Sequence, residues 1–272
     1  MKSLCIKTNN SESICYLLNS LENLEIEDTY FSCKTFKHYT NIIIHYLGND
    51  LDCFNSTICD LLVCLIIDNF EHKLLKQFLV QNYFYFDSLE INKVFEICED
   101  ILCESDDYSF ENRYNILFDN LYGYLFQNKK IYLNGFLNFR NKEYFKHLSD
   151  MIDISVNKFI IEREYLEFIS LLKMYINSHT PNTNLVNLYY NGTKPTLFDE
   201  NNNIIDVKSD AFDMKYLSDI SFSSNDYILN ALLTLVPQKI IIHLSDNSID
   251  EFINTLSLIF ENRIQIYKKS LI

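Results

Sequence analysis

The sequence has 272 residues, of which 48% are hydrophobic and 15% aromatic, and its formal net charge is −14. The hydrophobic content excludes an intrinsically disordered chain, and the acidic balance disfavours nucleic acid and anionic membrane surfaces, which an acidic protein repels. With only 4 Gly and 3 Pro, little of the chain can be a turn-rich β-sandwich or barrel, so helices should dominate.

An export signal or a membrane span is not expected. The chain turns polar from Lys7 to Glu12, which leaves no room for the apolar core of a signal peptide. The longest apolar run, Leu61–Ile67, has seven residues, whereas a membrane helix needs about 20. We therefore expect a soluble, cytoplasmic protein with reduced thiols.

The acidic residues are concentrated in one segment. Residues 50–128 hold 15 acidic and 4 basic side chains, a net charge of −11, whereas residues 129–180 hold 8 basic and 6 acidic ones. Only the stretch from Lys129 to Lys173 can present a basic face, and packing beside the acidic segment is the simpler role for it.

The first 49 residues are predicted to form a small α/β unit. Leu4–Ile6 reads as a short strand, and Ser11 can N-cap a helix that runs to Leu24. Residues 29–34 and 40–47 are rich in aromatic and β-branched residues and read as strands. A turn signal at Gly48-Asn49-Asp50 closes the unit.

Residues 50–180 are predicted to be helical. Apolar residues recur at steps of three and four over residues 58–78, and further helices are expected after Asp87 and over residues 110–126. A short extended piece at residues 129–135 precedes the longest helix, which should run from Asn134 to about Ser178. Because this helix is apolar almost all round between Met151 and Ile176, we expect it to be buried at the centre.

Residues 181–272 return to an α/β pattern. A helix over residues 225–235 should stop at Pro237, and Ser248 is expected to cap a final helix that ends near Phe260. Strands are predicted over residues 184–190, 196–199, 204–207, 239–244 and 263–267.

These elements predict an α+β fold in which a helical middle domain with a long central helix is flanked by small N- and C-terminal α/β units. The expected boundaries are residues 1–49 for the N-terminal α/β unit, 50–180 for the helical domain and 181–272 for the C-terminal α/β unit.

Four stretches in order carry a family resemblance: Asn82–Phe86, Leu133–Arg140, Phe159–Ile169 and Leu229–His243. Together they resemble the YtxC family of spore-forming Firmicutes, over roughly residues 80 to 267. The family is named for an association with endospore formation, and the resemblance implies no activity, cofactor or catalytic residue. The chain departs from the family pattern at Asn141, where an apolar residue is expected, and at Asn187, where related sequences tend to place a His. The second departure weakens any metal-ligand role for that strand.

The eight cysteines all lie in the first 103 residues, and none forms a C-x-x-C pair. Structural zinc sites prefer two such pairs, and the four-residue gaps seen here turn helical side chains apart. Reduced buried cysteine behaves as a small apolar residue, so we interpret the cysteines as core residues. No cofactor and no metal is expected.

Motifs for catalysis are not found. The six histidines form no H-E-x-x-H or H-x-E arrangement, and with 4 Gly there is no phosphate-binding loop or nucleophile elbow. His243 ends a predicted strand, which is a common place for a site, although a lone His is more often a hydrogen-bonded structural residue.

One segment is a candidate anion site. Asn134 and Gly135 open a predicted helix whose first N–H groups are free, and Arg140 and Lys142 follow within its first turns. A second interpretation is that Arg140 is buried against an acid of residues 96–107 and locks the packing. The candidate ligand-binding residues are Asn134, Gly135, Arg140, Lys142 and His243.

The leading hypothesis for function is a sporulation-associated cytosolic protein that is non-catalytic and acts through a protein partner, with no nucleic-acid or membrane role. A homodimer formed through an exposed aromatic patch is compatible with the sequence. The alternative is an enzyme or small-anion-binding protein that uses a site around Arg140, with Lys142, His147 and His243 contributing.

Overall fold

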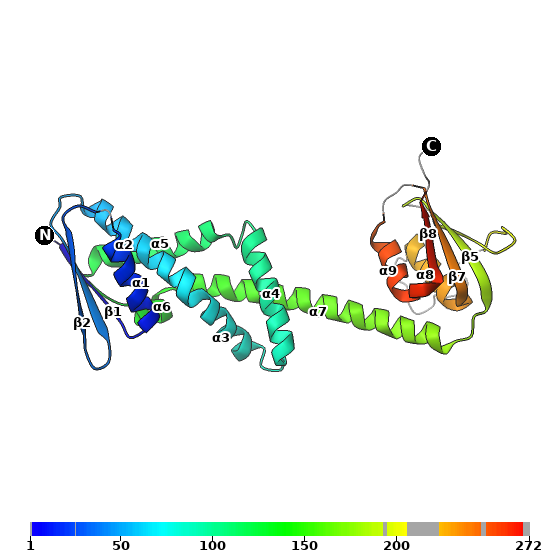
Figure 1. Cartoon of the computed structure of the whole chain (residues 1–272), viewed down its shortest axis with the longest axis horizontal. Helices are drawn as coiled ribbons and strands as arrows, with labels where there is room; N and C mark the ends of the chain where they lie inside the picture. Colours follow the sequence, from blue (N-terminus) through cyan, green and yellow to red (C-terminus); the bar gives the residue numbers. More distant parts are fainter. Residues whose placement is uncertain (1, 25, 193–194, 206–222, 246–248, 269–272) are drawn as a thin grey trace. The chain divides into compact units, whose positions relative to one another are not determined.

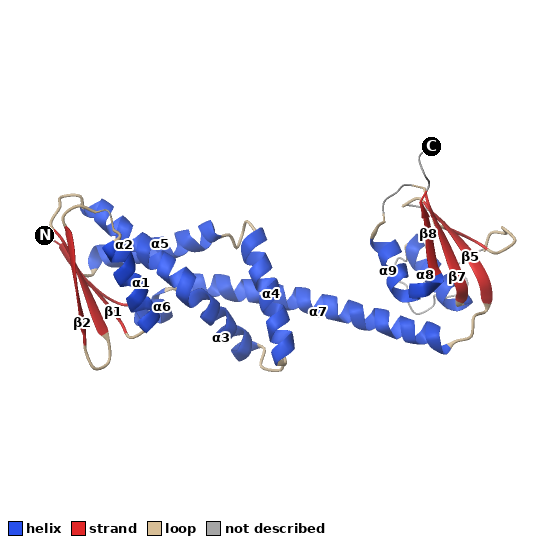
Figure 2. Cartoon of the chain, in the orientation of Figure 1, coloured by secondary structure: helices blue, strands red, loops and turns tan. Residues whose placement is uncertain are grey.

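The structure, a computed structural model, describes residues 2–24, 26–192, 195–205, 223–245 and 249–268 (Figure 1). It has the predicted α+β fold, with mixed sheets near both ends of the chain and a long helix in the middle of the sequence (Figure 2). The chain forms two compact units, Met1–Ile161 (unit 1) and Glu162–Ile272 (unit 2). The boundaries predicted after residues 49 and 180 would separate three parts of the chain that fold independently, and they stay a prediction.

Unit 1 begins with a four-stranded sheet, sheet A, in the order β2-β3-β1-β4. Its strands are β1 (Lys2–Thr8), β2 (Thr29–Thr35), β3 (Thr40–Tyr46) and β4 (Lys130–Tyr132), and helix α1 (Ser11–Glu22) follows β1. Strand β3 is antiparallel to β1 and β2, and β4 is parallel to β1. Side chains on one face, such as Leu4, Ile6, Ile42 and Ile44, are buried, whereas those on the other face of β1 and β3 are only partly covered.

Helix α1 is capped by the side chain of Asn10, and Ser11, the predicted cap, is its first residue. Five helical segments follow in unit 1 before β4. They are α2 (Leu51–Ile66), the π-helical turn η1 (Ile67–Glu71), α3 (His72–Asn82), α4 (Ser88–Glu104) and α5 (Phe110–Gln127). The side chains of Asp50, Asp87 and Ser109 accept hydrogen bonds from first-turn amides. The helix predicted over residues 58–78 is interrupted by η1, whose last residue is the buried Glu71.

The long helix predicted from Asn134 is two helices, α6 (Leu133–Arg140) and α7 (Lys142–Ser178). Asn141 lies between them and is completely buried. Its side-chain amide donates to the carbonyl oxygens of Phe136 (3.0 Å) and Leu137 (3.4 Å) in the last turns of α6, where backbone carbonyls begin to lack helical partners. Its own carbonyl accepts from Phe145 and so opens α7. Asn141 therefore divides the helix, which is a physical reason for an amide where an apolar residue was expected.

Burial along α7 changes part-way. Its side chains pack into the core of unit 1 as far as Phe159, as predicted. In unit 2 the prediction of complete burial is wrong, because only Ile169 and Ile176 are buried there. Large apolar side chains of the same segment are exposed: Leu166, Phe168, Leu171, Met174 and Tyr175. Despite the length of α7, none of the described helices is both long and apolar enough to cross a bilayer.

Unit 2 contains a second four-stranded sheet, sheet B, in the order β6-β5-β7-β8. Its strands are β5 (Thr183–Tyr190), β6 (Thr196–Phe198), β7 (Pro237–Leu244) and β8 (Ile264–Lys268), and its helices are α8 (Ser224–Leu235), α9 (Glu251–Phe260) and the 3-10 turn η4 (Glu261–Arg263). Strands β5, β7 and β8 are mutually parallel. Alternate residues of β5 and β7 pack against α8, α9 and the end of α7 in a core of their own.

Three details of unit 2 differ from the sequence prediction. Strand β7 begins at Pro237 itself, after Val236 ends α8 in a left-handed conformation. Asp250 caps α9, and Ser248, the predicted cap, lies outside the described residues. Of the strand predicted over residues 204–207, Ile204 forms a single bridge to Phe198, and residues 206 and 207 lie outside the described part.

Candidate functional site

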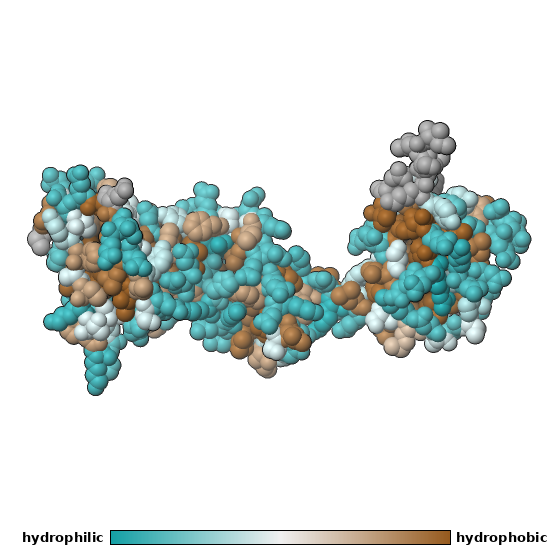
Figure 3. Space-filling view, viewed as in Figure 1, coloured by the Kyte–Doolittle hydropathy of each residue, from teal (hydrophilic) through white to brown (hydrophobic). Residues whose placement is uncertain are grey.

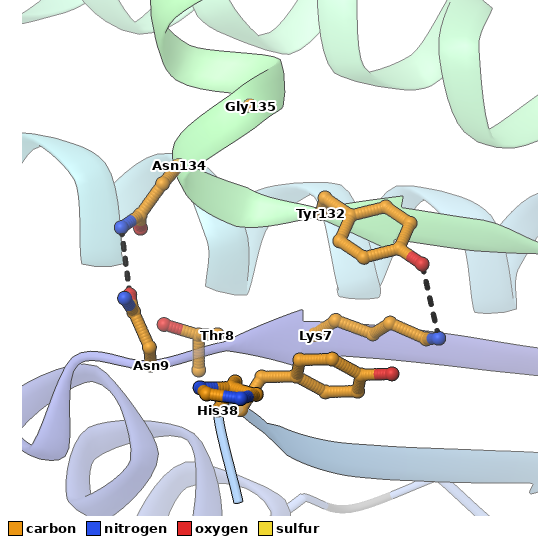
Figure 4. A pocket seen from close by; sticks show the side chains of 8 residues that line it. Lys7, Thr8, Asn9, His38, Tyr132, Asn134 and Gly135 are labelled. Atoms are coloured by element: carbon orange, nitrogen blue, oxygen red, sulfur yellow. Dashed lines mark hydrogen bonds between the residues drawn. The ribbon is translucent and has the colours of Figure 1, made fainter.

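A cavity of about 370 Å³ opens at one end of sheet A, and we call it the Lys7 pocket. Its walls come from the end of β1, the turn between β2 and β3, the end of β4 and the first turn of α6 (Figure 4). These walls come together because β4 pairs with β1, with Lys7 opposite Tyr132, and because β4 leads directly into α6. The lining residues are Lys7, Thr8, Asn9, His38, Tyr39, Tyr132, Asn134 and Gly135.

Lys7 is held between two tyrosine rings. Its Nζ donates to the Tyr132 hydroxyl at 3.1 Å and lies 4.8 Å from the centre of the same ring. The Tyr39 ring is 5.0 Å away on another side. The hydrogen bond with Tyr132 raises the pKa of Lys7 above its usual value, and cation–π contact also favours the charged form. The pocket therefore contains a positioned ammonium group.

Asn134 and Gly135, two of the predicted ligand-binding residues, line this pocket. The side-chain amide of Asn134 donates to the side-chain oxygen Oδ1 of Asn9 at 2.8 Å, which joins α6 to the loop after β1 (Figure 4). Tyr132, at the N-cap of α6, makes no side-chain capping bond to the helix. The structure thus brings the predicted helix start together with a lysine that is 125 or more residues away in sequence.

Arg140 and Lys142 do not line the pocket. Both side chains are exposed, and the Arg140 guanidinium lies 5.2 Å from the centre of the Tyr124 ring. No ion pair joins Arg140 to a carboxylate of the described residues, so the interpretation that it is buried against an acid of residues 96–107 is wrong. His147, which was considered with them, packs its ring against Tyr108 at 4.6 Å.

The buried arginine of unit 1 is Arg113, which the sequence did not single out. Its Nε lies 3.0 Å from Glu71 Oε2, and both side chains are at least nine-tenths buried. Tyr144, which is fully buried, donates its hydroxyl to the same oxygen at 2.6 Å. Burial beside Glu71 raises the pKa of Tyr144 well above its ordinary value. These residues join η1, α5 and α7, and their enclosure indicates a structural role.

His243, the remaining predicted site residue, is in unit 2. It lies on β7 in a row with Tyr189 of β5 and Tyr267 of β8. Its ring stacks on Tyr189 at 4.4 Å and on Tyr267 at 5.9 Å, and its Nε2 is 3.2 Å from Asn187 Oδ1. The imidazole is therefore fixed on all sides, which is what a hydrogen-bonded structural histidine requires.

All eight cysteines are free, and their burial corrects the interpretation that they are core residues. Cys59 and Cys98 are buried, and burial raises the pKa of Cys59 to about 12. Cys15, Cys33, Cys53 and Cys103 are exposed. Across the described ranges, no three His, Cys, Asp or Glu side chains gather into a group that could hold a metal ion.

Comparison with known proteins agrees with the ordered stretches. The sequence profile of the YtxC-like family matches residues 56–265. The chain belongs to the YtxC-like family. It is 22% identical over 191 residues to the uncharacterized protein YtxC of Bacillus subtilis (strain 168), an alignment that covers 68% of this chain and 67% of that protein. No solved structure matches the chain.

The family match includes one side of the Lys7 pocket and not the other. Tyr132, Asn134 and Gly135 lie within residues 56–265, whereas Lys7, His38 and Tyr39 precede them. The sequence alone pointed only to the first group, through the Asn-Gly start of a helix. Lys7 and the tyrosines gave no signal, because strands β1 and β4 pair across a long stretch of intervening helices.

Proposed function

We propose that this chain is a sporulation-associated cytoplasmic protein of spore-forming Firmicutes that is non-catalytic and acts by contact with a partner protein. The association with sporulation is what the resemblance to the YtxC family implies, and the family match over residues 56–265 supports that resemblance. The contact surface that we propose is the exposed apolar side of α7 in unit 2, defined by Leu166, Phe168, Leu171, Met174 and Tyr175 and called the α7 surface below.

The exposure of the α7 surface is the observation that carries this proposal. Four of its side chains, Leu166, Phe168, Leu171 and Met174, are between 51% and 66% exposed. Figure 3 shows hydrophobic surface along this part of α7. A helix that is apolar on most sides is normally buried, so several large apolar side chains exposed on one helix indicate an interaction site.

The test introduces charge on this surface. In a spore-forming host whose own copy is removed, a chain with Leu171→Glu and Met174→Glu should fail to restore heat-resistant spores, because two carboxylates oppose burial in an apolar interface. The matched control carries Gln238→Glu and Asn254→Glu, which place the same charge on exposed polar positions of unit 2 outside α7. Circular dichroism should show both variants folded.

Direct contact is tested by photo-cross-linking in sporulating cells. A benzophenone side chain at position 171 should give one discrete adduct, and the same group at position 254, outside α7, should give none. An adduct of twice the chain mass identifies a homodimer, and any other single mass identifies a second protein. Normal sporulation of the Leu171→Glu, Met174→Glu chain, together with no adduct, overturns the proposal.

The alternative of a small-anion site at Arg140 has one observation in its favour. Its guanidinium is exposed and pairs with no carboxylate of the described residues. If Arg140 binds an anion needed for function, Arg140→Ala should lower spore yield while the Leu171→Glu, Met174→Glu chain sporulates normally. The opposite pattern supports the α7 surface.

A further inference from the structure

The open face of sheet A differs in charge from the rest of the chain. Its four strands contain four lysines and no Asp or Glu, in a chain of net charge −14. Lys2 is on the covered side, where it donates to Asn55. Strand pairing places the other three, Lys7, Lys34 and Lys130, on the same open face. Such segregation of charge favours an anionic ligand at this face.

Lys7 is the lysine of this face that a cavity presents to a ligand. Of its three N–H donors, one goes to Tyr132. No ion pair joins it to a carboxylate among the residues that the structure describes. Two donors of a positioned cation thus remain available in a cavity of about 370 Å³, within the usual size range of small-ligand pockets.

The remaining walls suit an anion with a carbon skeleton. The rings of Tyr39 and Tyr132 meet edge to face, with centres 6.4 Å apart and planes at 75°. The Asn134 amide lies at the other end of the pocket from the Lys7 ammonium, which points towards Tyr132 (Figure 4). The Lys7 ammonium can therefore donate to an anionic group whose apolar part contacts the edges of the two rings.

We propose that the Lys7 pocket binds a carboxylate, with Lys7 as the donor and the ring edges of Tyr39 and Tyr132 against the adjoining carbon chain. This site is separate from the α7 surface and does not depend on it. The carboxylate belongs either to a free small acid or to an acidic peptide segment, and both share the chemistry that the pocket recognises.

Two features favour a carboxylate over phosphate and nucleic acid. A carboxylate carries one negative charge, which matches one ammonium, whereas phosphate recognition favours several cations or the fork of arginine. Nucleobases stack on free aromatic faces, but the Lys7 ammonium lies over both tyrosine rings.

Isothermal titration calorimetry at low salt tests the proposal with four probes: glutarate, a capped peptide of five glutamates, inorganic phosphate and an oligothymidine. We expect glutarate, the peptide or both to bind. Binding of glutarate identifies a free acid as sufficient, and binding of the peptide alone identifies a protein segment. Tighter binding of phosphate or oligothymidine, or no binding of either carboxylate up to about 10 mM, overturns the proposal.

Matched variants separate this site from general attraction to a basic face. Lys7→Met removes the charge but keeps the apolar stem, and it should weaken carboxylate binding by about tenfold or more. Lys130→Met removes a lysine from the same face outside the pocket and should leave binding within about twofold. Equal losses in the two variants overturn the proposal. If Lys7→Met fails to fold, Tyr132→Phe provides the test, because it keeps the ring and removes the hydroxyl that accepts from the Lys7 ammonium. An unchanged affinity and enthalpy of carboxylate binding in Tyr132→Phe would contradict the assigned geometry.

Discussion

At the scale of single residues, one buried cluster of polar contacts in unit 1 centres on Glu71. One oxygen of this carboxylate accepts from Arg113 and from Tyr144, and Arg113 also donates to the Tyr108 carbonyl. Removing either Glu71 or Arg113 alone leaves a buried charge without its partner. The free-energy cost of that unpaired charge exceeds the net stabilisation that the ion pair provides.

We expect Glu71→Leu to lower the free energy of unfolding of the chain by roughly 3–5 kcal/mol, because it leaves Arg113 buried without its carboxylate. Urea denaturation followed by circular dichroism measures the change. The double variant Glu71→Leu, Arg113→Met should lose less than Glu71→Leu alone, since no buried charge remains. A double variant that loses as much as the sum of the two single ones contradicts this account.

Burial should also decide which cysteines react. At pH 8 in the native state, iodoacetamide should modify Cys15, Cys33, Cys53 and Cys103 and leave Cys59 and Cys98 unmodified, since burial encloses those two thiols and raises their pKa values. Mass spectrometry of digested protein measures the pattern. Full labelling in urea is the control, and native labelling of Cys59 as fast as Cys15 would show that the helix carrying it opens.

The same thiol makes stability depend on alkaline pH. The pKa of Cys59 is about 12 in the folded chain against an ordinary value of 9.0. Between these values the folded chain keeps a proton that the unfolded chain has lost, so the free energy of unfolding falls as pH rises, by at most about 1.4 kcal/mol per pH unit for this group. Cys59→Ala should flatten the fall in urea midpoint between pH 8 and 11 relative to the unchanged chain. An identical slope contradicts the assignment.

At the scale of elements, local signals in the sequence were sufficient for most boundaries. The side chain of Asp87 accepts from two first-turn amides of α4 while Glu90 bonds back to it, and Ser223 with Asp226 does the same for α8. Strand β3 was predicted from its run of aromatic and β-branched residues, and its side chains alternate in burial as those of a strand do. The break at Asn141 was missed, because its cause is a side chain that folds back on carbonyls four and five residues earlier.

Asn141→Ala should lower the free energy of unfolding by about 1–2 kcal/mol, since two carbonyls at the end of α6 lose their donor in a buried place. Asn141→Asp should cost more than Asn141→Ala, although it has nearly the same shape, because a carboxylate accepts hydrogen bonds and cannot donate to those carbonyls. Thermal unfolding of the two variants compares them. If Asp is tolerated better than Ala, the capping role is wrong.

At the scale of the whole molecule, the sequence could not supply the contacts that build the Lys7 pocket. Asn134 and Gly135 were found through a local turn signal, whereas Lys7 reaches them only because β4 adds to the edge of β1. Strand β4 has three residues, too few for an alternating pattern, and nothing in its composition names β1 as its neighbour. The same limit explains the wrong prediction for the buried arginine. Arg140 was expected to be buried, whereas the buried arginine is Arg113.

The hydrophobic cores of the two units indicate which parts of the chain can fold alone. Sheet A contributes Leu4, Ile6, Ile42 and Ile44 to the core that the helices of unit 1 share. The ring of Tyr46 on β3 stacks on Phe54 of α2, with centres 4.8 Å apart and planes at 7°. Residues 1–49 therefore have no core of their own, whereas unit 2 has one around Val186, Ile240 and Leu256.

We accordingly expect a fragment of residues 1–161 to unfold cooperatively in urea, and a fragment of residues 50–180 to remain largely unfolded, because deletion of sheet A exposes the apolar face of α2. Far-ultraviolet circular dichroism and the sharpness of the transition measure this. The boundaries predicted at residues 49 and 180 require the opposite result, a folded 50–180 fragment. That outcome would mean that sheet A is an accessory to an independent helical domain, and that the Lys7 pocket can be lost without loss of the helices.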